Sequence, residues 1–300
     1  MKILIIGARG FIGSHLIKFF KKNNISYYGL VKDSNIGKNK TEKYFQFNEK
    51  NILRFIPEIT HIINCAGTST VKSNKLLNKK HKKYNEVITR LLVNILKKNK
   101  IKNKIIIHLS SQAVYDINSN NPKNENTKLK PFNYYGKTKL VSEKLLEQSQ
   151  DNQIIILRLF SIYGNENKKQ LIWDACQKFL KDKLFFQGSG YEVRDFLHID
   201  DLIRLFKIIV KSKIKKKLNI YNVGFGVGTE IFEVVEQIKR NFKIFKPLKF
   251  EKRFNPNNVR DVFVSNNSKI YKDYGWKPRV SLKKGLKSYV QWFKKKAKFL

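Results

Sequence analysis

The chain has 300 residues, of which 41% are hydrophobic and 28% charged, and its formal net charge is +39. This hydrophobic content is that of a globular protein and excludes a disordered or fibrous chain. Two cysteines exclude a disulfide framework, and the apolar runs are too short for a signal peptide or a membrane span, so we expect a cytoplasmic protein.

The positive charge is mostly lysine, since 52 of the 62 basic residues are Lys, spread along the whole chain. Such a charge is found in proteins that bind nucleic acid or anionic membranes. The chain also has only 5 Ala and many Asn, Ile, Phe and Tyr, as an A/T-rich coding sequence would produce. We therefore interpret the lysines as a solvated surface and expect neither nucleic acid nor a membrane as a partner.

Apolar runs and helical periods alternate in the first half of the chain. The apolar runs predict strands at 2–6, 26–31, 61–66, 104–110 and 153–160. Helical periodicity lies between them at 11–22, 82–98 and 137–148. Near-continuous apolar strands separated by helices predict an α/β fold, a doubly wound parallel sheet of the Rossmann type. We expect a dinucleotide-binding domain over residues 1–165.

The rhythm loosens after residue 165. Predicted helices at 170–181, 200–211 and 229–241 alternate with Gly-bearing turns such as "QGSGYE" and "VGFGVG". This pattern predicts a smaller C-terminal α/β lobe over residues 166–300, mainly for substrate binding. Segments at about 195–225 are expected to return to the first domain.

A glycine-rich turn follows the first predicted strand, in the stretch "ILIIGARGFIGSHL". Glycine has no Cβ to block the close approach of a pyrophosphate, and the next helix offers N–H groups and a positive dipole end. The spacing is G-x-x-G-x-x-G rather than G-x-G-x-x-G, yet its place between a strand and a helix predicts dinucleotide binding. The predicted cofactor contacts here are Gly7, Arg9, Gly10, Phe11, Ile12 and Gly13.

The choice between NAD and NADP should depend on the end of the second predicted strand, where an acidic residue would hold the ribose 2′-hydroxyl. The letters there are "GLVKDSN", so Lys32 precedes Asp33. Lys32 at the reading position favours NADP, whereas Asp33 there favours NAD. Arg9 adds a cation that can pair bidentately with a 2′-phosphate. We expect NAD or NADP as the cofactor, with a preference for NADP.

A Tyr-x-x-x-Lys spacing occurs twice, as Tyr135/Lys139 and as Tyr28/Lys32. The second pair lies on a predicted strand, where residues four apart are distant. Tyr135 and Lys139 share one face of a predicted helix. Ser111 ends the preceding predicted strand, and parallel-sheet ligands bind outside the carboxyl ends of the strands. Context therefore favours Tyr135, with Ser111 as its partner.

These three residues have a coherent chemistry. A phenol with a pKa of ~10 is a poor base at neutral pH. The Lys139 ammonium and an oxidised nicotinamide would favour the phenolate and lower the pKa of Tyr135. Ser111 can then orient the hydroxyl or carbonyl group of a substrate.

The chain resembles the extended short-chain dehydrogenase/reductases, in particular the NAD-dependent epimerase/dehydratase family that acts on nucleotide sugars. The motifs that carry this resemblance are, in chain order, "GARGFIG", "HIINCAG", "YNEVITRLLVNIL", "HLSSQAVYD", "YYGKTKLVSEKLL", "LRLFSIYG", "VRDFLHIDD", "YNVGFGVG" and "YGWKPRVSLKKGL". They cover nearly the whole chain.

The resemblance implies roles for individual residues. Ser111, Tyr135 and Lys139 would be the catalytic triad, with Lys139 also holding the nicotinamide ribose. Asn85 would be a structural residue on a helix, and a homodimer through two helices of the first domain is expected. Further cofactor contacts would be Ala66, Gly67, Phe160, Ser161 and Ile162; contacts to the substrate diphosphate would be Arg194 and Arg260.

The residues after Ser111 bear on the reaction. Dehydratases of this family carry an Asp-Glu pair there, whereas this chain has Gln112 and Ala113, which cannot shuttle a proton. We therefore expect a nucleotide-sugar 4-epimerase with a transient 4-keto intermediate. The alternative is an NADPH-dependent reductase of nucleotide 4-keto-6-deoxysugars, which Lys32 and Arg9 favour. A non-catalytic RNA-binding or regulatory member would have no need for the complete triad.

Overall fold

The computed structural model describes residues 1–32, 44–68, 74–119, 121–149, 151–214, 216–252 and 261–297. It divides into two compact units. The first consists of residues 1–116, 129–159 and 206–221, and the second of residues 117–128, 160–205 and 222–300. The assignment of cofactor to the first part of the chain and substrate to the second stays a prediction.

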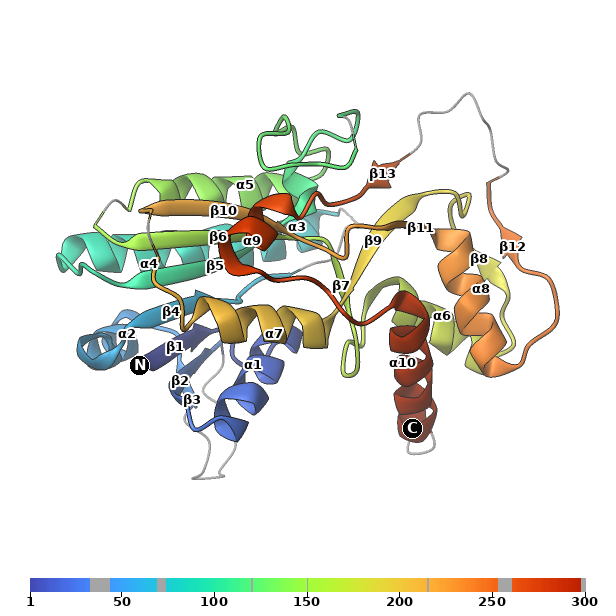
Figure 1. Ribbon diagram of the computed structural model, residues 1–300, viewed down its shortest axis with the longest axis horizontal. Coiled ribbons are helices and arrows are strands. Elements are labelled where there is room, and N and C mark those ends of the chain that lie inside the picture. The colour runs from blue at the N-terminus through green and yellow to red at the C-terminus, as the bar shows by residue number, and fades with distance from the viewer. Residues whose placement is uncertain are drawn as a thin grey trace. The chain divides into compact units, whose positions relative to one another are not determined.

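A seven-stranded sheet is the centre of the first unit. Figure 1 shows helices on both sides of this sheet. The strand order is β10-β6-β5-β4-β1-β2-β3, and the pairings from β6 to β3 are parallel. The strands are β1 Lys2–Ile6, β2 Ser26–Val31, β3 Tyr44–Gln46, β4 His61–Asn64, β5 Ile105–Ser111, β6 Gln153–Leu159 and β10 Leu218–Val223. This confirms the predicted doubly wound parallel sheet.

Helices cover this sheet because their apolar faces need burial. They are α1 Phe11–Lys22, α2 Glu49–Phe55, α3 Lys75–His81, α4 Ile88–Lys98 and α5 Tyr134–Glu147. A π-helical segment, η2 Lys82–Val87, joins α3 to α4, and 3-10 turns η1 and η3 span Ile56–Glu58 and Gln112–Val114. Leu92 of α4 and Leu146 of α5 belong to one buried cluster with Ile62, Ile106 and Ile154 of the strands. Burial of that apolar area holds the helices on the sheet.

The second unit has smaller sheets. Strands β7 Ser161–Tyr163, β9 Val193–His198, β11 Gly228–Glu230 and β13 Val262–Phe263 form a mixed sheet, and β8 Phe185–Phe186 pairs with β12 Lys249–Phe250. The helices are α6 Gln170–Leu180, α8 Ile231–Phe242, α9 Ser268–Tyr274 and α10 Leu282–Ala297, and α7 Ile199–Ile209 crosses the division between the units. Phe179, Val234 and Leu286 belong to the buried hydrophobic core of the second unit.

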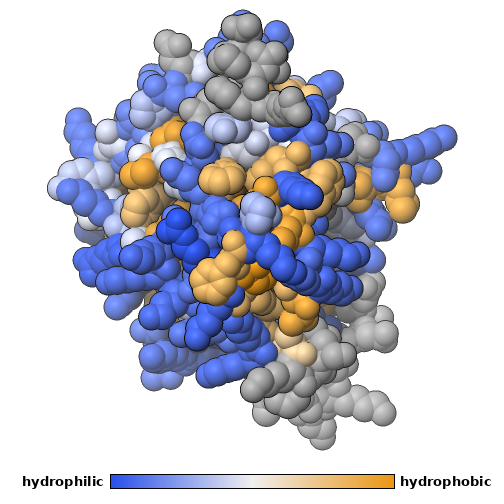
Figure 2. Space-filling model, turned by 90° about the vertical axis from the view of Figure 1, so that its right-hand side faces the viewer, coloured by the Kyte–Doolittle hydropathy of each residue, from blue (hydrophilic) through white to orange (hydrophobic). Residues whose placement is uncertain are grey.

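The surface mixes hydrophilic and hydrophobic side chains. Figure 2 shows one face on which blue hydrophilic side chains surround a band of orange hydrophobic ones. Phe185, Phe232 and Phe245 are among the exposed large hydrophobic residues of the second unit. Among the described residues, none of the helices has both the length and the apolar character needed to span a bilayer.

The predicted elements agree with the observed ones, with shifts at their ends. The predicted helix at 137–148 begins earlier, at Tyr134, because Asn133 caps it by accepting a hydrogen bond from the Gly136 N–H. The short strand β3 was not predicted, since three residues carry no clear period. Asp201, in the first turn of α7, accepts hydrogen bonds at its carboxylate from the backbone N–H groups of Arg279 and Val280.

Candidate active site

The glycine turn after β1 has the geometry expected of a pyrophosphate cradle. Gly7 adopts a φ of +81°, which L side chains rarely adopt, and a Cβ there would lie 2.7 Å from the Ala66 nitrogen. Gly10 is the N-cap of α1, whose first turn has no acidic residue and no side-chain cap among the described residues. The positive end of the α1 dipole is therefore available to an anion. These residues fit a dinucleotide.

A second turn, after β4, borders the same region. Asn64 Oδ1 accepts a hydrogen bond from the Ala66 N–H at 3.2 Å and so fixes this turn. A Cβ on Gly67 would lie 2.8 Å from Asn85 Oδ1 and 3.1 Å from Lys139 Nζ. At both Gly7 and Gly67, the Cβ of a larger residue would thus collide with neighbouring side-chain or backbone atoms. The predicted cofactor residue Gly67 is thus brought next to Lys139, and Ala66 directly precedes it.

The cations predicted to select NADP both lie against aromatic rings. The Arg9 guanidinium lies 5.0 Å from the ring centroid of Tyr44, and Lys32 Nζ lies 5.7 Å from that of Tyr84. Cation–aromatic contacts restrain such side chains without neutralising them. Asp33, the competing residue for NAD, lies outside the described residues.

Ser111, Tyr135 and Lys139 are brought together from β5 and α5. Ser111 is the last residue of β5, and its Oγ accepts a hydrogen bond from the Ala113 N–H at 3.2 Å. Lys139 is 4% exposed, and its Nζ donates to the Leu109 carbonyl at 2.7 Å. Tyr135 is the second residue of α5, and its hydroxyl lies near enough to the Ser111 side chain for that side chain to affect its pKa. The structure thus brings the three predicted residues to the carboxyl end of β5 and the start of α5, and their catalytic role stays a prediction.

The protonation of these groups is set largely by burial. Burial raises the pKa of the Tyr135 phenol, and the nearby Ser111 side chain partly opposes this. The protein alone thus does not show the lowering of that pKa that we expected, because desolvation outweighs the effect of Ser111. Burial lowers the pKa of Lys139 to about 8, while Cys65 and Glu143 oppose the lowering. Lys139 is therefore poised to titrate near neutral pH.

Asn85 organises the helices around the triad, as expected of a structural residue. It is fully buried, and its Nδ2 donates to Thr138 Oγ1 at 3.1 Å. Its Oδ1 accepts from the Thr68 N–H at 3.0 Å, and its carbonyl accepts from Ser142 Oγ at 2.5 Å. Asn85, within the η2 segment, thus joins the turn after β4 to α5.

Sequence reasoning missed several buried polar residues beside the triad. His81 is 1% exposed, its ring centroid lies 5.5 Å from that of Tyr135, and its Nδ1 shares a 2.6 Å hydrogen bond with Thr68 Oγ1. Glu143 and Arg158 form an ion pair that is almost fully buried. The spacing of Glu143, one turn after Lys139, was a usable signal. Nothing local to Arg158 or His81 pointed to them.

The remaining predicted residues belong to the second unit. Phe160 precedes β7, Ser161 and Ile162 lie within it, and β7 pairs with β9 in parallel. Arg194 of β9 forms an ion pair with Asp261 and donates Nη1 to the carbonyls of Val193 and Asp261, both at 2.9 Å. Arg260 lies outside the described residues. The substrate contacts thus stay predictions.

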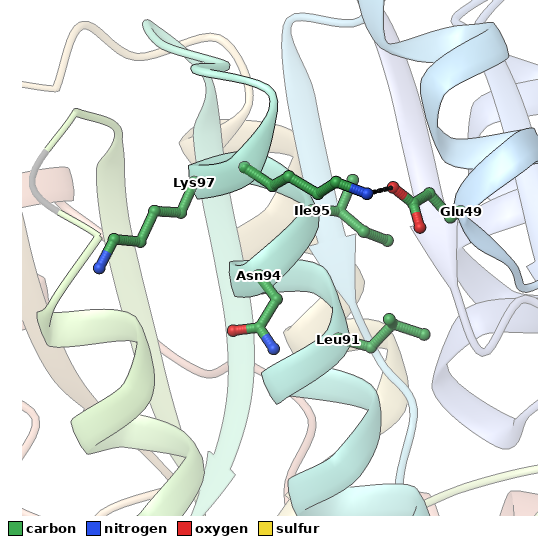
Figure 3. A pocket seen from close by; sticks show the side chains of 6 residues that line it. Glu49, Leu91, Asn94, Ile95 and Lys97 are labelled. Atoms are coloured by element: carbon green, nitrogen blue, oxygen red, sulfur yellow. Dashed lines mark ion pairs between the residues drawn. The ribbon is translucent and has the colours of Figure 1, made fainter.

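A surface cavity of about 490 Å³ lies elsewhere in the first unit, between α2 and α4. Figure 3 shows its lining side chains, with an ion pair of 3.5 Å between Lys98 and Glu49. Leu91 and Ile95 supply its apolar part. It contains none of the predicted site residues, so we do not include it in the site.

This chain belongs to the NAD-dependent epimerase/dehydratase family, because the family model described as "NAD dependent epimerase/dehydratase family" matches residues 3–224. A UDP-glucose 4-epimerase of Lactobacillus helveticus is 27% identical over 312 residues, which cover 93% of this chain and 92% of that protein. A dTDP-D-glucose 4,6-dehydratase of Dictyostelium discoideum is 26% identical and covers 98% of this chain and 81% of that protein.

Solved structures agree with this membership. The crystal structure of a UDP-glucuronic acid 4-epimerase from Bacillus cereus, in complex with UDP-glucuronic acid and NAD, superposes with a TM-score of 0.83 at 25% identity. The match covers 98% of this chain and 99% of that one. Relatives thus include both epimerases and a dehydratase, so the reaction has to be argued from this chain's own residues.

Proposed function

We propose that the protein is a nucleotide-sugar 4-epimerase that uses a bound nicotinamide dinucleotide. The observation that carries this proposal is the placement of Ser111 at the end of β5 and of Tyr135 at the start of α5, next to the buried Lys139, whose Nζ donates to the Leu109 carbonyl of β5. Names of relatives such as UDP-glucose 4-epimerase support the substrate class. The bound cofactor would supply the acceptance and return of a hydride.

Each residue of the triad has a defined task in this proposal. Tyr135 removes the proton from the sugar 4-hydroxyl and returns it to the 4-keto intermediate, acting in turn as general base and acid. Ser111 donates a hydrogen bond to the same sugar oxygen. The Lys139 ammonium stabilises the Tyr135 phenolate and would hold the nicotinamide ribose. Gly7, Gly10 and the N-terminus of α1 would hold the pyrophosphate.

The segment after Ser111 argues against water elimination. Gln112 and Ala113 form the start of a 3-10 turn, and Ala113 is buried. Neither side chain can donate or accept a proton, so no acid–base pair exists there to remove a hydroxyl group and a second hydrogen. We therefore propose epimerisation rather than dehydration, although a dehydratase is among the relatives.

The experiment is to purify the protein, release any bound cofactor and identify it by its ultraviolet spectrum and chromatography. The protein is then incubated with UDP-glucose or UDP-glucuronic acid, and the 4-epimers are separated and quantified. We expect near-stoichiometric bound cofactor and conversion without added cofactor. Conversion that consumes reduced cofactor, or no conversion of any nucleotide sugar, would overturn the proposal.

A second candidate is an NADPH-dependent 4-keto-sugar reductase, which Arg9 and Lys32 favour. Their side chains lie against Tyr44 and Tyr84, and a 2′-phosphate would gain charge-assisted hydrogen bonds from them. Replacing Arg9 or Lys32 by Ala should weaken NADPH binding about 10-fold or more and leave NADH binding nearly unchanged. The exposed Lys22, at the end of α1, is the matched control. Equal affinity of the wild type for both cofactors would remove the support for a reductase.

A further inference from the structure

A buried ion pair joins the two elements that carry the predicted triad. Arg158 of β6 and Glu143 of α5 have side chains that are 2% and 0% exposed. Arg158 Nε lies 3.1 and 3.2 Å from the two carboxylate oxygens of Glu143, and Nη2 donates at 2.7 Å. This is a bidentate geometry, which fixes the direction of both side chains as well as their separation.

Two further residues complete this network. Ser110 Oγ donates a hydrogen bond to Glu143 Oε1, and Arg158 Nη1 donates to the Tyr115 hydroxyl at 3.1 Å. Ser110 pairs with Arg158 across β5 and β6, so the two are neighbours in the sheet. Ser110 directly precedes Ser111, and Tyr115 ends the turn that follows it. The network therefore holds both sides of Ser111.

Stability alone is a weak explanation for such a pair. Replacing a buried ion pair by apolar residues of similar volume is often neutral or stabilising, because both charges lose their hydration on burial. The position of the pair is more informative. Glu143 lies one helical turn after Lys139, on the same face of α5, and its carboxylate opposes the lowering of the Lys139 pKa.

In the described part of the chain, the other titratable groups noted near Lys139 are neutral at neutral pH. Cys65, after β4, has its pKa raised to about 12 by burial, and His108, on β5, has its pKa lowered well below the usual value. Tyr135 lies on the same helix, and burial raises its pKa as well. Glu143 is thus the neighbour that supplies a negative charge to the Lys139 ammonium.

We propose that Glu143 and Arg158 are positioning residues, which hold the ends of β5 and α5 in register and keep Lys139 charged. Their role rests on the proposed function of Lys139 but does not depend on the sugar or on the direction of the reaction. The network acts on Lys139 and Ser111 rather than touching a substrate itself.

The test is calorimetric titration of the protein with NAD and NADP between pH 6.5 and 9.5, in buffers of different ionisation enthalpy. Such titrations give the number of protons taken up on binding, and Lys139→Met identifies the part due to Lys139. We expect the midpoint of this uptake near pH 8 in the wild type, following the pKa of Lys139. Glu143→Gln should move the midpoint down by about one pH unit, because Lys139 loses the carboxylate.

Glu147→Gln is the matched control, since Glu147 is an exposed residue on the same helix. Its midpoint should equal that of the wild type. Glu143→Gln leaves Arg158 buried without a carboxylate, so it can fail to fold. The double variant Glu143→Gln/Arg158→Gln avoids this, and it should show a smaller downward shift, because loss of the Arg158 cation partly offsets loss of the carboxylate. Folded variants with the wild-type midpoint would overturn the proposal.

The outcomes separate this inference from the proposed epimerase. A wild type that binds cofactor but converts no nucleotide sugar would defeat the epimerase, while the shift in Glu143→Gln would still establish the role of the pair. Conversely, if the protein is an active epimerase but the midpoint of proton uptake is unchanged in Glu143→Gln, only the present inference is defeated. A wild type that binds neither cofactor would defeat both.

Discussion

Lys139 Nζ donates a hydrogen bond of 2.7 Å to the carbonyl oxygen of Leu109, two residues before Ser111. The bond ties α5 directly to the carboxyl end of β5. It also places a cation that is 4% exposed beside the serine and tyrosine of the predicted triad. A lysine so buried contributes charge only while its surroundings keep it protonated.

Removal of the Tyr135 hydroxyl should abolish proton transfer. We expect Tyr135→Phe to lower kcat by about 10²- to 10⁴-fold, the usual contribution of a positioned acid or base, with a small change in KM. Tyr134→Phe is the matched control, because Tyr134 is adjacent on α5 but has Thr138 at the fourth position. Steady-state kinetics with UDP-glucose check this. Equal losses in both variants would show that the Tyr135 hydroxyl has no special role in proton transfer.

The activity should fall at alkaline pH. The pKa of Lys139 is about 8, so its ammonium is present below that pH and is lost as the pH rises through it. We expect kcat/KM to decline above about pH 8, and Lys139→Arg to remove that decline, because a guanidinium stays charged. Lys137→Met, an exposed lysine on the same helix, should keep the wild-type profile. A profile that is flat to pH 9.5 would contradict this assignment.

Mild acid should destabilise the fold through buried histidines. His108 is fully buried, and neither ring nitrogen has a hydrogen-bond partner among the described residues. Burial lowers its pKa well below the usual value, and lowers that of His61 to about 4. The unfolded chain binds these protons below a pH of about 6.5 while the native protein does not, so stability falls as the pH falls.

The variant His108→Leu isolates this effect. Between pH 6.5 and 5, one such histidine should cost about 2 kcal/mol of unfolding free energy. Urea unfolding at the two pH values should therefore show a loss that is smaller in His108→Leu by about that amount. His61 remains in both proteins and does not affect the difference. An identical loss in both would show that His108 is protonated in the native state.

Two glycines, Gly7 and Gly275, both have a left-handed backbone conformation. Comparing their Ala variants separates the cost of backbone strain from the cost of steric contact. Gly7 has a φ of +81° and a Cβ there would lie 2.7 Å from the Ala66 nitrogen, whereas Gly275 has a φ of +62° and nothing within 4 Å of its Cβ position. Gly275→Ala should cost about 1 kcal/mol, the price of the backbone conformation.

Gly7→Ala should cost clearly more than Gly275→Ala and should also weaken cofactor binding. Its Cβ would push the glycine turn away from the turn after β4, and both turns belong to the predicted cofactor site. Thermal unfolding and cofactor titration of the two variants measure this. Similar stability and unchanged cofactor affinity in both would contradict the close contact at Gly7.

The amino-acid sequence by itself predicted most of the strands and helices of the first unit and their alternation. Apolar runs such as 2–6 and 153–160 coincide with β1 and β6, because burial on both faces requires a nearly continuous apolar strand. The glycine turn and the Tyr135/Lys139 pair were also visible. The proposed roles of the turn and of the pair depend on short spacings, within one turn or on one helix face. Such spacings can be read directly from the sequence.

The tertiary structure alone decided which distant residues meet. Residues 218–223 join the sheet as β10, beside β6, and Arg158 meets Glu143 across 15 positions of sequence. A single buried arginine or histidine produces no periodic pattern in the sequence. Among 52 lysines, the sequence does not show which few are buried. Which charges pair in the interior depends on how strands and helices pack, because a buried charge is tolerated only where the fold brings it a partner.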